Sequence, residues 1–373
     1  MIRILHVIDH LGLGGAQSAL LDIVRSTSRA EYAVEVAVMH GRGQFADALE
    51  AEGFHVHVLS KTKNPPAYLW NFPRLLRAGN YDILHFHLNG ANWIAKTLAA
   101  AMGSQTARIA HDHTSGNLKF RGWQTLGPDA ATHHFSDAVI AVAQDVKDFL
   151  MRYEALAPDK VVVVPNGIDT DSFQPFTDEE RRAAREKLGL PADAFIAGSL
   201  GRLAFEKNFA LLVELAAAVP DLHIYLGGAG PLESDLRARI ASAGVGSRVI
   251  MPGQVTDRVG FYRALDVFIL PSLFEGRPLT ILEAMSSGLP VLASRRGGSP
   301  GAISEGKNGL LADPEDVHTF AAQLARLRES PAFSKKLAAA ARNTVLDLYS
   351  ATGTARQVEG VYKAVIAARS ESR

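Results

Sequence analysis

Short apolar runs alternate with longer amphipathic stretches along almost the whole chain, and this alternation restricts the fold more than any other feature of the sequence. In the first half the runs are IRILHVI, VEVAVM, HVHVL, ILHFH, ARIAH, AVIAVA and KVVVVPNG. Strands with one wet face alternate apolar and polar residues, whereas strands buried on both faces are mostly apolar. The runs therefore predict a parallel sheet with helices on both faces.

The pattern stops at residues 170–194, which are polar and contain prolines, and then restarts with FIAGSLG, LHIYLGG, RVIMPG, DVFILP and PVLAS. A chain of 373 residues is long enough for two domains. We expect two doubly wound α/β domains, 1–169 and 170–351, followed by a helix at about 352–373 that could pack on either domain. Ligands of such sheets bind beyond the carboxyl ends of the strands, here in a cleft between the domains.

Charge and composition exclude several classes of protein. Lys and Arg total 39, as do Asp and Glu, so the net charge is zero and general affinity for nucleic acid is not expected. The chain has no cysteine, which excludes disulfides and thiolate metal sites and is typical of a reducing compartment. No signal peptide begins the sequence and no run of 18 apolar residues occurs, so we expect a cytoplasmic protein.

A glycine-rich turn, LGLGGAQSALLDIV, follows the first expected strand and opens a helix. Such a turn lets backbone N–H groups approach an anion or a sugar, although a tight turn without a ligand would use the same residues. Gln17 stands where a dinucleotide fingerprint needs its third glycine, and the next strand ends at Met39 and His40 where an acid is needed. A nicotinamide or flavin enzyme is therefore disfavoured, and no P-loop motif occurs.

The second half opens with SLGRLAFEKN, which places Arg202 and Lys207 between a strand and a helix. Two cations are unfavourable at a helix N-terminus, where the dipole favours anions. A bound polyanion would stabilise them, and a pair of solvated surface cations is the alternative. Their place at the carboxyl end of a strand favours the polyanion.

The segment FEGRPLTILEAMSSGLPVLAS contains two acids eight positions apart. Pro278 suits the first turn of a helix that ends near Ser287, before Gly288. Glu275 then lies in the loop that precedes the helix, and Glu283 lies on its second turn.

Free backbone amides around Leu279 and Thr280, at the start of this helix, would bind phosphate. Carboxylates accept hydrogen bonds from vicinal hydroxyls, so two of them would suit the ribose and the hexose of a sugar nucleotide. Alternatively, Glu283 pairs within its own helix.

Several ordered motifs resemble those of the family 4 glycosyltransferases. They are GLGGAQ, VVPNGID at 163–169, GRLAFEKN, LGGAGP at 226–231 and the long segment with two glutamates, and they span nearly the whole chain. The resemblance implies a GT-B fold and transfer of a sugar, with retention of configuration, from a UDP- or GDP-linked donor to an acceptor hydroxyl, in the synthesis of polysaccharide, lipopolysaccharide or glycolipid. No metal or cofactor is implied, because the nucleotide-sugar is a co-substrate.

The resemblance also implies roles for particular residues. Arg202 and Lys207 would bind the donor diphosphate. Glu275 would lie beside the hydroxyls of the donor sugar, and Glu283 would bind the ribose. The family places a histidine after an N-domain strand, against the donor sugar. We assign this role to His113, which starts the loop in RIAHDHTSG, and His111 is the alternative.

The remaining donor-binding assignments concern backbone groups. Gly14 and Gly15 would let the first loop close on the donor phosphate or the acceptor, and Gly228 belongs to the second glycine turn. Leu279 and Thr280 would contribute their amides. The expected catalytic set is thus Glu275, His113, Arg202 and Lys207.

Two features depart from common patterns. Gly301 stands where the family often has an acid after PVLAS, which leaves the local donor contacts open. Asp169 and Asp171 form a D-x-D, which binds a divalent metal in another glycosyltransferase fold. Because this pair follows PNG at the hinge, we expect a hinge element without metal.

The acceptor is suggested only by residues 61–77. This segment contains basic and aromatic residues and no acid: Lys61, Lys63, Arg74 and Arg77, with Tyr68, Trp70 and Phe72. Together with KFRGW at 119–123, it could anchor the protein at the inner face of an anionic membrane, which suits a lipid-linked saccharide acceptor. A free saccharide acceptor, with an ordinary helix whose aromatics are buried, is the alternative.

Two other functions remain open. A sugar-nucleotide epimerase of the same fold would form product from the donor alone. A non-catalytic protein of polysaccharide assembly or sugar-nucleotide sensing would not need Glu275, Glu283, Arg202 and Lys207 together.

Overall fold

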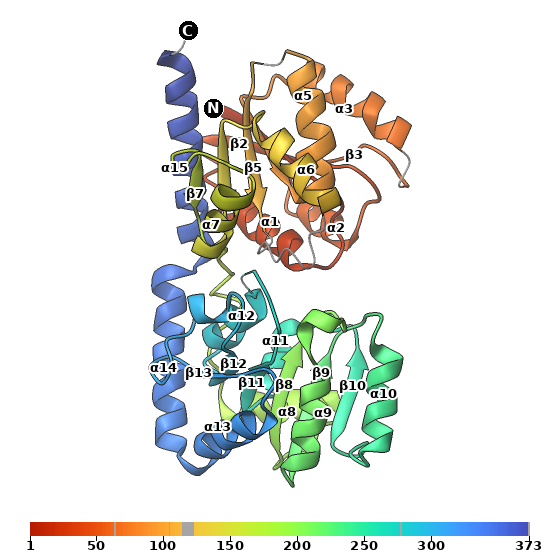
Figure 1. Ribbon diagram of the computed structural model, residues 1–373, viewed down its shortest axis with the longest axis vertical. Helices are drawn as coiled ribbons and strands as arrows, with labels where there is room; N and C mark the ends of the chain where they lie inside the picture. Colours follow the sequence, from red (N-terminus) through yellow and green to blue (C-terminus); the bar gives the residue numbers. More distant parts are fainter. Residues whose placement is uncertain (63–64, 104, 114–122, 277, 372–373) are drawn as a thin grey trace. The chain divides into compact units, whose positions relative to one another are not determined.

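The computed structural model describes the chain apart from residues 63–64, 104, 114–122, 277 and 372–373 (Figure 1). The chain divides into two compact units. The first contains Met1–Gly167 and Ala351–Arg373, and the second contains Ile168–Ser350. Each unit is a sheet of parallel strands with helices packed against it.

Within the described residues, the first unit holds a seven-stranded sheet in the order β3-β2-β1-β4-β5-β6-β7. Every neighbouring pair in this sheet is parallel. Its strands are β1 (Ile2–Ile8), β2 (Tyr32–Val38), β3 (His55–Val58), β4 (Ile83–His87), β5 (Ala107–Asp112), β6 (Ala138–Ala141) and β7 (Val161–Val163).

Helices connect these strands, as parallel pairing requires. They are α1 (Gly15–Ser26), α2 (Gln44–Ala51), α3 (Pro65–Gly79), α4 (Leu88–Gly90), the π-helix η1 (Ala91–Ala95), α5 (Lys96–Ala101), α6 (Trp123–His133) and α7 (Gln144–Tyr153).

The C-terminal helix α15 (Ala351–Glu371) belongs to the first unit, where it packs beside α1 (Figure 1). Its Val358 and Tyr362 are fully buried among core residues of the sheet such as Ile4 and Ile109. Glu359 also accepts a hydrogen bond from the backbone N–H of Ser28 (2.8 Å). The last helix of the chain therefore completes the core of the domain that the first residues begin.

The described part of the second unit holds a six-stranded parallel sheet, in the order β10-β9-β8-β11-β12-β13. Its strands are β8 (Phe195–Leu200), β9 (Leu222–Gly227), β10 (Val249–Gly253), β11 (Val267–Leu270), β12 (Val291–Ser294) and β13 (Leu310–Ala312). Its helices are α8 (Asp178–Leu188), η2 (Phe205–Lys207), α9 (Ala210–Ala218), α10 (Glu233–Ser242), α11 (Arg258–Arg263), α12 (Leu279–Ser286), η3 (Ser299–Gly301), α13 (Val317–Glu329) and α14 (Pro331–Leu348).

The composition of the strands explains the sandwich of helices and sheet. Every residue of β4, β6, β11 and β12 is buried. A strand covered on both faces has no position at which a polar side chain reaches water, which accounts for the continuous apolar runs. The expectation of two doubly wound α/β domains is confirmed.

Candidate functional site

The order of strands reverses at one point in each sheet, and loops that follow the strands at this point carry several of the candidate residues. In the second unit the chain fills one side of the sheet from β8 to β10, then returns to place β11 on the other side of β8. The first unit reverses in the same way between β1 and β4. Loops that follow the two strands of a reversal diverge at the carboxyl edge and leave room for a ligand.

The loops after β8 and β11 bring Lys207 and Glu275 together. The backbone N–H of Leu273 donates to the carbonyl of Glu206 (2.8 Å), which holds the two loops side by side. Lys207 then forms an ion pair with Glu275, which also accepts a hydrogen bond from the Ser272 hydroxyl (2.9 Å). Both side chains of the pair are 15% exposed, so a ligand can reach them.

Arg202 lies on the same loop as Lys207, and its side chain is exposed. The second glycine turn packs closely against this loop. A Cβ on Gly228, whose φ is 141°, would lie 1.8 Å from the carbonyl oxygen of Gly201. Only glycine fits such an approach. This packing is by itself a sufficient reason for a glycine at 228.

Helix α12 carries the second glutamate. It starts at Leu279, with Pro278 at its N-cap and Leu279 and Thr280 in its first turn, and it ends at Ser286. The N-cap provides no side-chain acceptor for the first amides. These N–H groups are therefore able to bind an anion.

Glu283 is 2% exposed and pairs outside its own helix. It forms an ion pair with Arg258 and accepts a hydrogen bond from the Tyr262 hydroxyl (2.7 Å), both on α11. Burial raises the pKa of Glu283, although the Arg258 charge and the Tyr262 hydroxyl oppose this shift. The sequence motifs did not predict Arg258 and Tyr262 as partners of Glu283. Strand β11 separates α11 from α12 along the chain, and no motif relates residues of the two helices.

The segment after β12 also contacts the Glu275 loop. A Cβ on Gly297, whose φ is 66°, would lie 2.6 Å from the backbone nitrogen of Glu275, and the N–H of Gly298 donates to the Glu275 carbonyl (3.0 Å). Gly301, which replaces an acid often found in the family, ends η3. Its carbonyl accepts a hydrogen bond from the hydroxyl of Tyr349 (2.9 Å).

In the first unit, the glycine loop leaves β1 and opens α1. Gly14 is the N-cap of α1 and has no side chain to satisfy the first amides, and Gly15 is the first residue of the helix. Both are exposed, and a Cβ on Gly15 would meet no other atom within 4 Å. The open end of α1 is therefore accessible to a ligand.

The two candidate histidines differ in exposure. His111 is buried in β5, whereas His113 follows the strand and is partly exposed. Their rings stack with centroids 4.2 Å apart. His113 thus lies nearer the sheet edge, and residues 114–122, which follow it and include most of KFRGW, lie outside the described residues.

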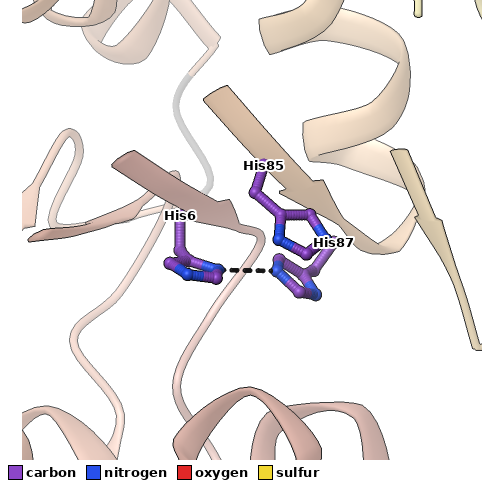
Figure 2. Close-up of side chains that lie close together, drawn as sticks. All are labelled: His6, His85 and His87. Atoms are coloured by element: carbon purple, nitrogen blue, oxygen red, sulfur yellow. Dashed lines mark hydrogen bonds between the residues drawn. The ribbon is translucent and has the colours of Figure 1, made fainter. Parts of the chain in front are cut away.

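Three further histidines lie close together: His6 on β1, and His85 and His87 on β4 (Figure 2). The rings of His85 and His87 also contact the rings of His111 and His113. Nδ1 of His6 and Nε2 of His87 are 3.0 Å apart, and Nδ1 of His87 is 3.2 Å from Nε2 of His113. This cluster was not predicted from the sequence, although the H-x-H spacings in ILHFH and AHDH offered a signal for part of it. They place both histidines of a strand on one face.

Burial holds these imidazoles neutral. It lowers the pKa of His6 to about 3 and that of His113 to about 4. It also lowers the pKa values of His85, His87 and His111 well below the ordinary value of 6.5. A neutral imidazole has one donor and one acceptor nitrogen, so His113 would act on a ligand through hydrogen bonds and not as a cation.

The hinge D-x-D forms a local turn. The Asp169 carboxylate accepts hydrogen bonds from the backbone N–H groups of Asp171 and Ser172, both 3.0 Å long. Arg342 donates to the carbonyl of Thr170 beside it (3.1 Å).

Residues 61–77 form most of α3, and their aromatic side chains divide between the core and the surface. Tyr68 and Phe72 are buried, whereas Trp70 is 66% exposed and its ring lies 5.2 Å from the Arg74 guanidinium. Lys63 lies outside the described residues. Among the helices of the described chain, none is sufficiently long and apolar to cross a membrane.

Comparison with protein families identifies the chain. Residues 13–172 match the family described as Glycosyltransferase Family 4, and residues 180–344 match the family described as Glycosyl transferases group 1. Two doubly wound α/β domains are the architecture of the GT-B fold. The chain belongs to the family 4 glycosyltransferases and is a glycosyltransferase.

Individual relatives agree with this assignment. The chain is 33% identical over 269 residues to the D-inositol 3-phosphate glycosyltransferase of Corynebacterium jeikeium, covering 66% of this chain and 64% of that protein. It is 28% identical over 272 residues to the UDP-Gal:alpha-D-GlcNAc-diphosphoundecaprenol alpha-1,3-galactosyltransferase of Escherichia coli, covering 69% and 68%.

Among solved structures, Anabaena HepE in complex with UDP-glucose superimposes with a TM-score of 0.88 at 21% identity, covering 98% of this chain and 100% of that one. The likeness confirms the expected GT-B fold.

Proposed function

We propose that the protein transfers a hexose from a UDP-linked donor to an acceptor hydroxyl, with retention of configuration. The observation that carries the proposal is the cluster at the strand reversal of the second unit. There the Lys207 and Glu275 pair, the exposed Arg202 and the free amides of α12 lie on adjoining segments. Such a set offers positive charge for a diphosphate and a carboxylate for sugar hydroxyls.

Catalysis in this proposal is mainly electrostatic. The acceptor attacks from the face that the diphosphate leaves, and the leaving diphosphate helps to remove the acceptor proton. Arg202, Lys207 and the α12 amides stabilise the charge that develops on the leaving phosphate. Glu275 orients the donor sugar. His113, which is neutral, and the open end of α1 at Gly14 and Gly15 would contact the donor or the acceptor from the first unit.

Glu283 would bind the ribose in this proposal. Its carboxylate already pairs with Arg258 and Tyr262, which fix its orientation and leave lone pairs for hydroxyl groups. The packing that requires Gly228 would hold the glycine turn against the Arg202 loop, so its role would be to shape the site rather than to bind the donor through a side chain.

UDP is favoured as the nucleotide by two relatives. The name of the Escherichia coli enzyme specifies UDP-Gal, and the Anabaena protein binds UDP-glucose. The Escherichia coli name also specifies a diphosphoundecaprenol-linked acceptor. We infer an acceptor of the same class, a saccharide linked to a lipid in polysaccharide, lipopolysaccharide or glycolipid synthesis, used at the inner face of the cytoplasmic membrane.

A thermal-shift panel tests the donor. UDP, GDP, ADP and their common sugar conjugates are compared without metal and then with added magnesium. A ligand that binds only the folded protein raises its unfolding midpoint, so UDP conjugates should stand out. A larger shift with GDP would change the donor class, and no shift with any nucleotide would contradict the site.

The acceptor requirement separates transfer from epimerisation. Incubation of the donor alone should give no new sugar nucleotide. The donor should only hydrolyse slowly to free sugar and the nucleoside diphosphate. Conversion of the donor to its epimer in the absence of acceptor would favour the epimerase instead.

A further inference from the structure

The histidine cluster of the first unit lies on one face of three adjacent strands. His6 and His85 are paired in register between β1 and β4, and His87 and His111 are paired between β4 and β5. Alternate residues of a strand share a face, so His85 joins His87 and His111 joins His113. The cluster is larger than one donor-contacting histidine needs, and the proposed function leaves its buried members without a task.

Hydrogen bonds do not satisfy the cluster. Nδ1 of His85 lies 2.7 Å from the hydroxyl of Tyr362, but its Nε2 is buried and has no hydrogen-bond partner among the described residues. Both ring nitrogens of His111 are in the same situation. A buried polar group without a partner destabilises the folded state, so several such atoms in one cluster require an explanation.

A bound cation would supply the missing partner. His6, His85 and His87 are fully buried, and each offers a ring nitrogen within 4.8 Å of the others (Figure 2). Two nitrogens bound to tetrahedral zinc at about 2.0 to 2.1 Å are roughly 3.4 Å apart. Nδ1 of His6 and Nε2 of His87 are already 3.0 Å apart, so these two nitrogens would separate by a few tenths of an ångström to hold the ion.

We propose that His6, His85 and His87 bind a divalent transition-metal ion of the zinc class. Neutral imidazoles suit Zn²⁺, Co²⁺, Ni²⁺ and Cu²⁺, whereas Mg²⁺ and Ca²⁺ prefer oxygen ligands. Three histidines leave a fourth position, which water would fill. A second triple, His87, His111 and His113, shares His87. We prefer the first because all three of its histidines are buried and a hydrogen bond orients His85.

Tyr362 provides that orientation. A metal-binding histidine usually engages its other ring nitrogen in a hydrogen bond, which fixes the tautomer and the direction of the ring. The hydroxyl of Tyr362 does this at Nδ1 of His85 and leaves Nε2 for the ion. Because Tyr362 comes from α15, the site would join the C-terminal helix to the sheet. Tyr362 is thus a positioning residue.

The test uses protein without a polyhistidine tag. The metal-stripped protein is titrated with Zn²⁺ by calorimetry, and with Co²⁺ while the visible absorption bands of tetrahedral cobalt are recorded. We expect one equivalent to bind with nitrogen ligands, and the bound ion should raise the unfolding midpoint. Absence of binding by either metal would overturn the proposal.

Variants locate the site. His85→Asn keeps a polar atom near the position of Nδ1, and so can hold the Tyr362 hydrogen bond, but it removes Nε2. This change should lower the affinity by more than 100-fold. Tyr362→Phe should lower it by about 10- to 100-fold, as expected for loss of a partner behind a ligand. The control His55→Asn removes an exposed histidine and should change nothing.

Two results would assign the binding elsewhere. Equal losses in His85→Asn and His55→Asn, or unchanged affinity in His85→Asn, would indicate adventitious surface binding. If His85→Asn does not fold by circular dichroism, X-ray absorption of the wild-type cobalt protein decides: three imidazole ligands support the site, and an oxygen-only shell overturns it. Failure here would leave the UDP thermal shift, which tests the transferase proposal, unaffected.

Discussion

At the scale of single residues, the ion pair between Lys207 and Glu275 couples two parts of the candidate site. Without a ligand, Glu275 holds the ammonium group of Lys207 in place, and Ser272 holds Glu275. An ammonium group has three N–H donors, so Lys207 can bind a phosphate oxygen and keep its carboxylate partner. The pair would thus fix the proposed sugar-binding carboxylate and the proposed phosphate-binding cation relative to each other.

Replacing Lys207 tests this coupling. Lys207→Ala should lower kcat by about 100- to 1,000-fold, the usual effect of removing one donor that stabilises developing charge. The control Lys187→Ala removes an exposed lysine of the same unit, paired with Asp257, and should retain nearly full activity. Both variants are assayed for donor turnover and for unfolding midpoint. Near-normal turnover in Lys207→Ala would exclude it from the mechanism.

The buried carboxylate of Glu283 gives a pH dependence. Because burial raises its pKa, it takes up a proton at a higher pH than an ordinary glutamate, whose pKa is about 4.3. A protonated carboxyl accepts fewer hydrogen bonds from ribose, so UDP affinity should decrease as the pH falls through the raised pKa. Calorimetric titration at a series of pH values above acid unfolding measures this.

The variant Glu283→Gln separates this effect from titration of the nucleotide phosphate. It should bind UDP more weakly and lose the part of the profile that Glu283 causes, and an unchanged profile would contradict the ribose assignment. For stability without nucleotide the sign is opposite. The folded protein holds this proton more tightly than the unfolded chain, so the contribution of Glu283 to stability falls as the pH rises through the same range.

At the scale of elements, α3 presents different side chains to the core and to solvent. Tyr68 and Phe72 are four positions apart and buried, whereas Trp70 lies between them on the opposite face with Arg74. Tyr68 and Phe72 are therefore core residues of an ordinary helix, which was the alternative to a membrane anchor. Trp70 and its neighbouring arginines remain available to a membrane surface.

The double change Arg74→Glu and Arg77→Glu tests membrane association through this helix. It should reduce binding to liposomes that contain anionic lipid, because each basic residue near such a surface contributes about 1 kcal/mol. The control Lys335→Glu and Lys336→Glu makes the same change of charge on exposed residues of α14. Co-sedimentation at low and physiological salt compares them. Equal binding by both variants would exclude α3 as the anchor.

Sequence reasoning succeeded where the information is local. Apolar runs predicted the strands, and the proline and glycine around α12 predicted its position to within one residue of each end. It failed where distant segments meet. The sequence places Glu283 on a helix but does not identify its partners. Arg258 and Tyr262 become its partners only because α11 lies against α12. Likewise, the histidines at 6, 85 and 111 become neighbours only through the strand order, which no single motif encodes.

Glycine positions were ambiguous for a related reason. A glycine-rich turn indicates a close approach but not what approaches. At Gly228 the answer is the carbonyl of Gly201, whereas Gly15 faces no atom of the chain within 4 Å. Gly15 thus has more free space around it for a ligand than Gly228 has.

At the scale of the whole molecule, the first unit is discontinuous in sequence. Its sheet is formed by residues before 168, but its core is completed by α15, which follows the entire second unit. The hydroxyl of Thr354 at the start of α15 donates to the carbonyl of Pro165 (2.9 Å), and Arg369 near its end forms an ion pair with Asp137. The second unit is continuous from Ile168 to Ser350 and contains every candidate donor residue with a charged side chain.

This arrangement predicts unequal effects of truncation. A chain that ends at Ser350 lacks Val358 and Tyr362, and exposes the sheet face that they cover, so the first unit should lose its cooperative unfolding transition. The second unit should still unfold cooperatively and should still be stabilised by UDP.

The control removes only residues 371–373 and should behave as the full chain. Scanning calorimetry with and without UDP, with limited proteolysis, measures both units. Retention of both transitions would show that α15 is dispensable to the first core, whereas loss of the UDP effect would show that the donor site needs the first unit as well.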